Sequence, residues 1–328
     1  MSRLYRLTLF SLAFVGLGFI SYSCHRDIIA LPSTDQSIAP SNAPSFGDST
    51  ESVTTEPLED ISINELPDDD DFHQQVRFWA DNFNYIPSTV PQFFQCQIQR
   101  NQITPPQWAD LMQKTNWLKT HHDYKFDLAD TYLLLHSELN QLAQPRDEII
   151  DQIAHHLAPI PHTYRPASYP GAADDYCEDF VGRSDLFSYT DLRRIKLILS
   201  ALTRPTTVNL LRQLLLEDME DRASEVGGLC FLDNQEVRFQ TYAPGLRGAD
   251  NMYVESHQML RDASLCISRW HCHADREKSF RLAGPGLDDL KFAKYYGTSL
   301  VIITYINARM MNIDFCTIQG EVVDLGNY

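Results

Sequence analysis

The chain is short of basic residues. Its 328 residues include 27 Lys and Arg but 44 Asp and Glu, which gives a formal net charge of -17 at pH 7. No nucleic-acid partner is expected, because phosphate binding needs a basic surface. An anionic membrane surface would also repel such a body. Solubility explains the acidity more simply than a specific cationic partner does.

The chain also has no CxxC pair, so a zinc site built from cysteines is not expected. Seven cysteines are present, and the first, Cys24, ends an apolar segment. The remaining six are an even number, which is compatible with disulfides in an oxidising compartment, although their spacing gives no pairing. The length gives a prior of two domains, and a hydrophobic content of 43% is enough for a sizeable core.

The N-terminus has the pattern of an export signal. Arg3 and Arg6 precede an uncharged stretch over 7–23, and Cys24 follows it directly. This arrangement resembles a bacterial lipoprotein signal over 1–24, in which Cys24 becomes the lipidated first residue. A cleaved secretory signal and an uncleaved anchor are the alternatives, in that order. All three place the body outside the cytoplasm, as an envelope lipoprotein anchored to a membrane or as a secreted protein.

Two regions follow the signal. Residues 25–71 are rich in Pro, Ser, Thr and acid, so they predict a disordered tether that buries too little surface to offset its ordering entropy. Residues 72–203 predict a mostly helical region of unknown role. One helix begins with Thr104 as N-cap, Pro105 at the first position and Gln107 at the third. Two more helices each have an apolar face, formed by Ile149, Ile150, Ile153 and Leu157 and by Leu192, Ile195, Leu199 and Leu202.

Two histidine pairs in this region, His121/His122 and His155/His156, suggest metal at first sight. Neighbouring positions on a helix point about 100° apart, so such a pair does not converge on one ion. Surface or half-buried histidines are therefore expected.

Residues 204–328 predict a mixed α/β (α+β) domain. A helix leads into two strands joined at Asp233-Asn234, with Val237, Phe239 and Thr241 on one face. The later elements are a short helix near 252–260, a strand through "SLCISRWHCHA", a helix stopping at Gly297, a central strand "SLVIITYI" and a hairpin turning at Gln319-Gly320.

The strand "SLCISRWHCHA" carries the main candidate site. Side chains two apart on a strand face the same way, so His271 and His273 point to one side and Cys272 to the other. Asp288 and Asp289 open the following helix and offer a third ligand. Two histidines and one carboxylate leave a fourth position for water, as in catalytic zinc sites. The bland alternative is a strand whose histidines hydrogen-bond locally.

Three segments together resemble the JAMM (MPN-plus, JAB-like) metallopeptidase pattern: "SEVGGLCFL", "WHCHA" and "PGLDDLKFAKYYGTSLVIIT". The resemblance covers roughly 206–328. It implies a JAMM-like fold, Glu225 as general base, and Zn2+ bound by His271, His273 and Asp289. It also implies cleavage of a peptide or isopeptide bond by a zinc-activated water.

Three departures from the pattern stand out. Gly286 occupies the place of a serine that helps to stabilise the oxyanion, and losing one such donor costs on the order of 10²–10³ in rate. Ala274 stands where proline is common. The segment over 273–286 is longer than in the peptidase members and is more like bacterial JAB-type domains of unassigned role.

Other side chains surround the expected site. Asp275, Asp288 and Gly286 are candidates for supporting contacts to the ligands. Arg269 shares the face of the histidines and suggests either a substrate contact or, preferably, a salt bridge at the rim.

Two functions follow from these patterns. The first is an exported zinc-dependent hydrolase acting on a peptide or protein substrate. The second is a non-catalytic envelope protein that holds a peptide or partner on a JAMM-like fold. Gly286 favours the second function, and the retained Glu225 favours the first.

Overall fold

The computed structural model describes residues 71–163, 176–177, 180–221, 223–245, 247, 253–274 and 283–328. The predicted signal with Cys24, the tether up to residue 70, and Asp275 lie outside these residues. In the described part, no helix is both long and apolar enough to cross a membrane.

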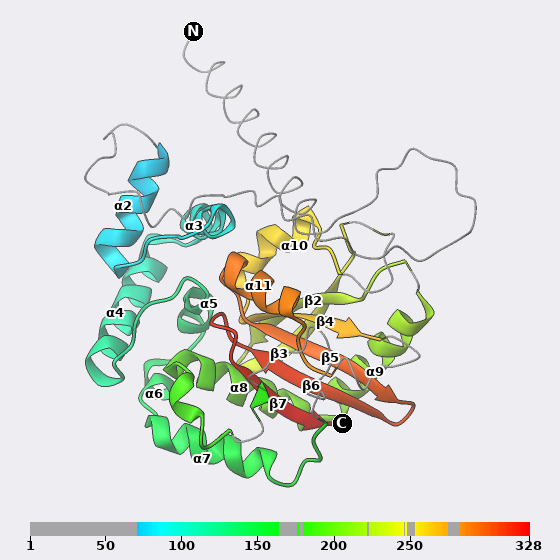
Figure 1. The fold of residues 1–328 in the computed structure, drawn as a ribbon. Coiled ribbons are helices and arrows are strands. Elements are labelled where there is room, and N and C mark those ends of the chain that lie inside the picture. The colour runs from blue at the N-terminus through cyan, green and yellow to red at the C-terminus, as the bar shows by residue number, and fades with distance from the viewer. Residues whose placement is uncertain are drawn as a thin grey trace, which may run out of the picture. The chain divides into compact units, whose positions relative to one another are not determined.

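The described chain is mixed α/β, with helices first and a sheet at the C-terminal end (Figure 1). The helices before the main strands are α2 (Asp71–Phe83), α3 (Val90–Gln102), α4 (Pro105–His121), α5 (Asp130–Leu135), α6 (Leu139–Leu142), α7 (Arg146–Leu157), α8 (Tyr189–Leu202) and α9 (Pro205–Glu220). Two helices, α10 (His257–Asp262) and α11 (Leu287–Tyr296), lie between strands, and short 3₁₀ turns occupy Ser184–Leu186 and Ala263–Leu265.

Seven strands form one sheet in the order β1-β7-β6-β5-β4-β2-β3. They are β1 (Tyr176–Cys177), β2 (Gly227–Asp233), β3 (Glu236–Tyr242), β4 (Ser268–His273), β5 (Leu300–Asn307), β6 (Met310–Cys316) and β7 (Val322–Asn327). The pairs β1–β7 and β4–β5 are parallel and the other pairs are antiparallel. The predicted central strand is therefore central, since β5 has three strands on each side.

Successive side chains of a strand point to opposite faces of the sheet, and both faces are covered by helices. Val301 and Ile303 of β5 belong to the large core that includes Ile195 and Leu211 of the helices. Leu300 and Ile302 of the same strand join a smaller core with Ala293 of α11 and residues of β6 and β7. Strand β5 is thus apolar on both faces, as its continuous hydrophobic run predicted.

The core runs without a break from the early helices into the sheet. The same cluster of buried side chains contains Trp79 of α2, Leu192 of α8, Trp270 of β4 and Phe315 of β6. The predicted boundary at 203/204 falls between α8 and α9, both of which contribute to this core. The division into two domains stays a prediction.

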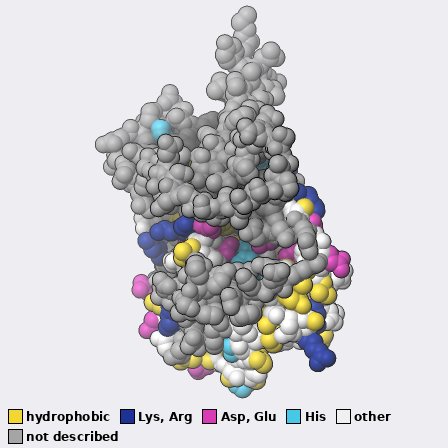
Figure 2. All heavy atoms as spheres, turned by 45° about the vertical axis from the view of Figure 1, so that its right-hand side comes forward, with side chains coloured by type: hydrophobic (Ala, Val, Ile, Leu, Met, Phe, Trp, Pro, Cys, Tyr) yellow, Lys and Arg dark blue, Asp and Glu magenta, His cyan; other side chains and the backbone are white. Residues whose placement is uncertain are grey.

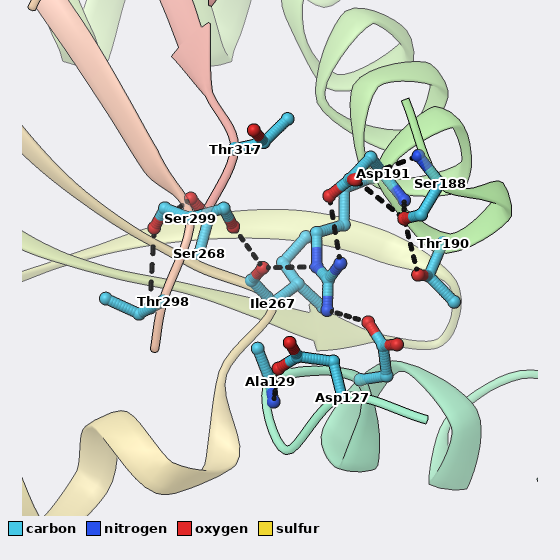
Figure 3. Close-up of polar contacts among 12 residues, drawn as sticks. Asp127, Ala129, Ser188, Thr190, Asp191, Ile267, Ser268, Thr298, Ser299 and Thr317 are labelled. Atoms are coloured by element: carbon cyan, nitrogen blue, oxygen red, sulfur yellow. Dashed lines mark hydrogen bonds and ion pairs between the residues drawn. The ribbon is translucent and has the colours of Figure 1, made fainter. Parts of the chain in front are cut away.

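A buried ionic cluster links these helices to the sheet (Figure 3). The Arg194 guanidinium donates to Asp130 Oδ1 at 2.5 Å, to Asp191 Oδ1 at 3.5 Å and to the carbonyl oxygen of Ile267 at 3.0 Å. The remaining oxygens are also used: Tyr124 Oη donates to Asp130 at 2.7 Å, and Ser188 Oγ donates to Asp191 at 2.6 Å. Helices α5 and α8 are thereby held against the start of β4.

Several expected details of the fold are confirmed. Thr104 and Gln107 form the capping box of α4, and Gly297 ends α11 in a left-handed conformation with φ of 60°. The apolar faces predicted for α7 and α8 are buried. The last hairpin turns at Gly320, where φ is 95°.

Other details are corrected. The β2–β3 turn lies at Asn234 and Gln235, which have positive φ, one residue later than expected. Thr241 is exposed although Val237 and Phe239 are buried, and Tyr242 is buried in a separate small core with Leu229. The short helix begins at His257 rather than near 252. The five cysteines with described side chains, Cys96, Cys230, Cys266, Cys272 and Cys316, are free and buried, so no disulfide framework forms among them.

Candidate metal centre

His271 and His273 lie side by side at the carboxyl end of β4. Their Nε2 atoms are 3.1 Å apart, and the side chains are 12% and 13% exposed. Cys272 between them is fully buried in the large core on the opposite face. The alternation expected from the sequence is confirmed, because the core requires Cys272 to face inward and so turns both imidazoles the other way.

Asp289 meets the histidines because of the chain's path. Strands β4 and β5 are adjacent and parallel, and α11 is the crossover between them. In such a unit the helix begins at the carboxyl end of the first strand, which is the end that carries His273. Asp289 Oδ1 lies 3.2 Å from His271 Nε2, and Oδ2 lies 3.5 Å from His273 Nε2.

These separations fit one metal ion. Tetrahedral zinc bonds imidazole nitrogen and carboxylate oxygen at about 2.0–2.1 Å, which places neighbouring ligand atoms roughly 3.3 Å apart. The observed separations of 3.1, 3.2 and 3.5 Å lie around that value. Hydrogen bonding alone explains the cluster less well, because two imidazole nitrogens facing each other can share only one proton.

Glu225 reaches the same place from the neighbouring strand. The Cys272 N–H donates to the carbonyl oxygen of Val226 at 2.9 Å, and Gly227 is in register with His271. Glu225 therefore lies opposite His273, just before β2. It is 7% exposed, and its carboxylate forms a possible metal-binding group with the two histidines in which the ligand atoms lie within 4.8 Å of one another.

Glycine at position 228 keeps β2 close to its neighbours. A Cβ there would meet the carbonyl oxygen of Gln240 at 1.8 Å, which no rearrangement of a side chain relieves. The Gly-Gly pair after Glu225 thus allows β2 to pack between β3 and β4 near the site.

The two carboxylates differ in their electrostatics. Burial raises the pKa of Glu225, and the nearby histidines only partly offset this effect. Burial also acts to raise the pKa of Asp289, but His271 and His273 outweigh it and hold that pKa well below its usual range. An ionised Asp289 suits a metal ligand, and a carboxylate with a raised pKa suits a proton acceptor.

The supporting residues divide into three cases. The Gly286 N–H donates to Asp289 Oδ2 at 2.7 Å, so Gly286 does support the carboxylate. Asp288 does not join the site, because its side chain is 82% exposed and pairs with Lys291 at 3.0 Å. Asp275 lies outside the described residues.

Arg269 is not a rim residue as expected. Its side chain is 2% exposed and pairs with Glu255 at 3.3 Å, and its guanidinium carbon lies 5.1 Å and 4.9 Å from the ring centres of Phe292 and Tyr296 of α11. Strand alternation predicts the face on which Arg269 lies but not its burial, which comes from the packing of α11 over this position.

One contact to Glu225 was missed. The backbone N–H of Tyr253 hydrogen-bonds to the Glu225 carboxylate. A main-chain donor has no residue signature, so no pattern in the sequence reveals it. The Arg269–Glu255 ion pair anchors the segment that contains this donor.

The other histidine pairs behave as expected. His121 stacks on Trp117 with ring centres 4.2 Å apart, and His122 stacks on Tyr189 at 4.1 Å. The His122 ring also lies 5.4 Å from the Trp117 ring, so both histidines pack among aromatic side chains. Neither this pair nor His155/His156 belongs to a possible metal-binding group in the described part of the chain.

The candidate centre is partly accessible. The side chains of His271, His273 and Asp289 are 12–20% exposed. Figure 2 shows histidine and acidic side chains together on one face of the molecule. Comparisons of the chain with family models, curated proteins and solved structures found no match.

Proposed function

We propose that the chain is an exported, zinc-dependent hydrolase of JAMM type that cleaves a peptide or isopeptide bond. The mutual approach of His271 Nε2, His273 Nε2 and the Asp289 carboxylate to 3.1–3.5 Å carries this proposal. Two imidazoles and one carboxylate are the donor set of catalytic zinc sites that keep one position open.

A zinc ion bound there would supply a water of lowered pKa and polarise the substrate carbonyl. Glu225, with its raised pKa and its place beside the histidines, would accept a proton from the attacking water and pass it to the leaving amine. The Tyr253 N–H orients the Glu225 carboxylate, and the Gly286 N–H orients Asp289.

The substrate in this proposal is a peptide or protein outside the cytoplasm, and lipidation at Cys24 holds the enzyme at a bacterial envelope membrane. Cys24→Ala is expected to move the protein from the membrane fraction to the soluble fraction. Equal membrane association of the parent and Cys24→Ala would exclude the lipid anchor, but it would leave the proposed metal site unaffected.

The competing function is a binding protein on the same site. Gly286 favours it, because the glycine offers no hydroxyl where the family pattern has one. In this alternative the cluster still binds zinc, but the protein hydrolyses no substrate, so Glu225→Gln has no activity to remove.

Metal analysis of the purified protein tests the proposal first. About one equivalent of zinc is expected in the parent and none in a His271→Ala/His273→Ala double variant. Hydrolysis of peptide and isopeptide substrates should then disappear in Glu225→Gln, which keeps the zinc. A parent that holds no zinc after reconstitution would end both the hydrolase and the zinc-binding alternative.

A further inference from the structure

A second polar site lies far from the metal cluster along β2. A pocket of about 470 Å³ is lined by residues of α6, α7 and α8, which lie together in Figure 1, and by Gln235 of the β2–β3 turn. Glu225 precedes the first residue of β2, whereas Gln235 follows the last. The pocket and the metal cluster are therefore at opposite ends of this strand.

Two cations in this pocket share one neutral oxygen. Lys196 Nζ donates to Gln144 Oε1 at 2.7 Å, and Arg193 Nη1 donates to the same oxygen at 3.5 Å. Neither group forms an ion pair with a carboxylate of the residues that the structure describes. In a chain with a net charge of -17, it is unexpected that two neighbouring cations of this pocket outnumber its one carboxylate, that of Glu148.

Arg193 is short of acceptors. The residue is 5% exposed, and its Nε has no hydrogen-bond partner within the described structure. A buried donor without an acceptor is unfavourable, and most such groups in proteins are satisfied. The neighbouring Arg194 shows the contrast, because its guanidinium meets two carboxylates and a carbonyl oxygen.

The surrounding amides are oriented toward the cations. Gln144 Nε2 donates to Glu148 Oε1 at 2.9 Å, which fixes the amide so that its oxygen faces Lys196 and Arg193. Glu148 Oε1 accepts a second bond from Gln152 at 3.0 Å, so this oxygen is held by two amides. Burial, followed by the charge of Arg193, lowers the pKa of Lys196, and the charge of Glu148 only partly offsets this effect.

We propose that this pocket binds a small organic anion, whose carboxylate or phosphate group lies between Arg193 and Lys196. Such a group gives the two cations a negative partner, which the neutral Gln144 amide does not supply. A volume of about 470 Å³ lies within the usual range for small-molecule sites and exceeds the needs of a bare anion. The charged group is therefore one end of a larger molecule.

Calorimetric titration of the full-length protein tests this site, with inorganic phosphate and succinate as the two probes. The ionic strength is held constant, and a chelator keeps metal off the histidine cluster. Lys196→Gln removes one cation, and Lys125→Gln removes an exposed lysine elsewhere as the matched control. Arg193→Lys keeps the charge but loses the planar fork.

At least one probe is expected to bind the parent and Lys125→Gln equally, and Lys196→Gln about tenfold or more weakly. The stronger probe tells whether the pocket selects phosphate or carboxylate. The His271→Ala/His273→Ala variant should bind as the parent does, so this outcome is independent of the proposed function. Three results overturn the site: no binding of either probe, equal weakening in both lysine variants, or loss of binding in the histidine variant.

Discussion

Two charged clusters flank β4, one at its beginning and one at its end. At the beginning, Arg194, Asp130 and Asp191 have side chains that are 1–5% exposed, and the donors of the guanidinium face acceptors. At the end, His271, His273 and Asp289 are 12–20% exposed, and two imidazole nitrogens face each other. The separations overlap in the two clusters, so distance alone does not distinguish them.

The difference lies in what the atoms converge on. In the Arg194 cluster each donor ends at an acceptor, which is the arrangement of a structural ion group in a core. In the histidine cluster, the ligand atoms point at one another around a shared centre, as they do around an ion. The Arg194 cluster thus needs no further group, whereas the facing nitrogens of His271 and His273 are suited to an ion between them.

The largest expected effect comes from breaking the Arg194 cluster. Arg194→Met should lower the free energy of unfolding by about 3–5 kcal/mol, because two buried carboxylates lose their cation. Denaturant unfolding measures the change. Arg183→Met is the control, since its ion pair with Glu321 is about a quarter exposed and such pairs contribute about 0–1 kcal/mol. Similar losses of unfolding free energy in both variants would contradict a special structural role of the Arg194 cluster.

The second largest effect is expected from a substitution at Gly286, beside the histidine cluster. A Cβ at Gly286 would lie 3.5 Å from Asp289 Oδ2, an ordinary contact, and its φ of -79° suits any residue. Gly286→Ser should therefore fold normally and supply the missing hydroxyl. On the proposed function it raises the hydrolysis rate by up to about 10²-fold at constant zinc content. Gly286→Ala is the matched control, and an equal gain in that variant would exclude the hydroxyl as the cause.

The sequence predicts the histidine cluster much better than the Arg194 cluster. Strand alternation places His271 and His273 on one face, and the order strand, helix, strand brings Asp289 to the end of β4. Both arguments are local. Arg194 lies 64 positions from Asp130 and 73 from Ile267, and no short pattern predicts such contacts.

The remaining errors have the same origin. Arg269 was placed at a rim because alternation gives the face of a strand but not the element that later covers it. The turn between β2 and β3 was placed one residue early, because Asn234 and Gln235 both take positive φ and glutamine gives no turn signal. The contact of Tyr253 with Glu225 uses a main-chain N–H, which every residue except proline carries.

A pH titration of stability tests whether the Arg194 cluster is balanced in charge. Asp127 lies beside it, and burial together with the charge of Asp130 raises the pKa of Asp127 to about 7. A raised carboxyl pKa means that the folded state binds the proton more tightly, so stability falls as the pH rises from about 4 to 7. Asp127→Asn keeps an oxygen to accept from the Ala129 N–H and removes that charge.

The Asp127→Asn variant should exceed the parent in unfolding free energy at pH 8 by on the order of 1–2 kcal/mol, and the gap should close toward pH 4. Thermal unfolding of both proteins across this range measures the difference. A gap that does not change with pH would mean that Asp127 keeps an ordinary pKa.

The smallest change in stability is expected for a substitution in the histidine cluster of the metal-free protein. In the presence of a chelator, His273→Ala should change the free energy of unfolding by less than about 1 kcal/mol, because the side chain is 13% exposed and its Nε2 lies 3.5 Å from Asp289 Oδ2, which is longer than an ordinary hydrogen bond. Zinc at a hundred times its dissociation constant should then stabilise the parent by about 2.7 kcal/mol and leave the variant unchanged. A large loss of stability in the metal-free variant would show that the histidines stabilise the fold, as Arg194 does, and do not form a metal site.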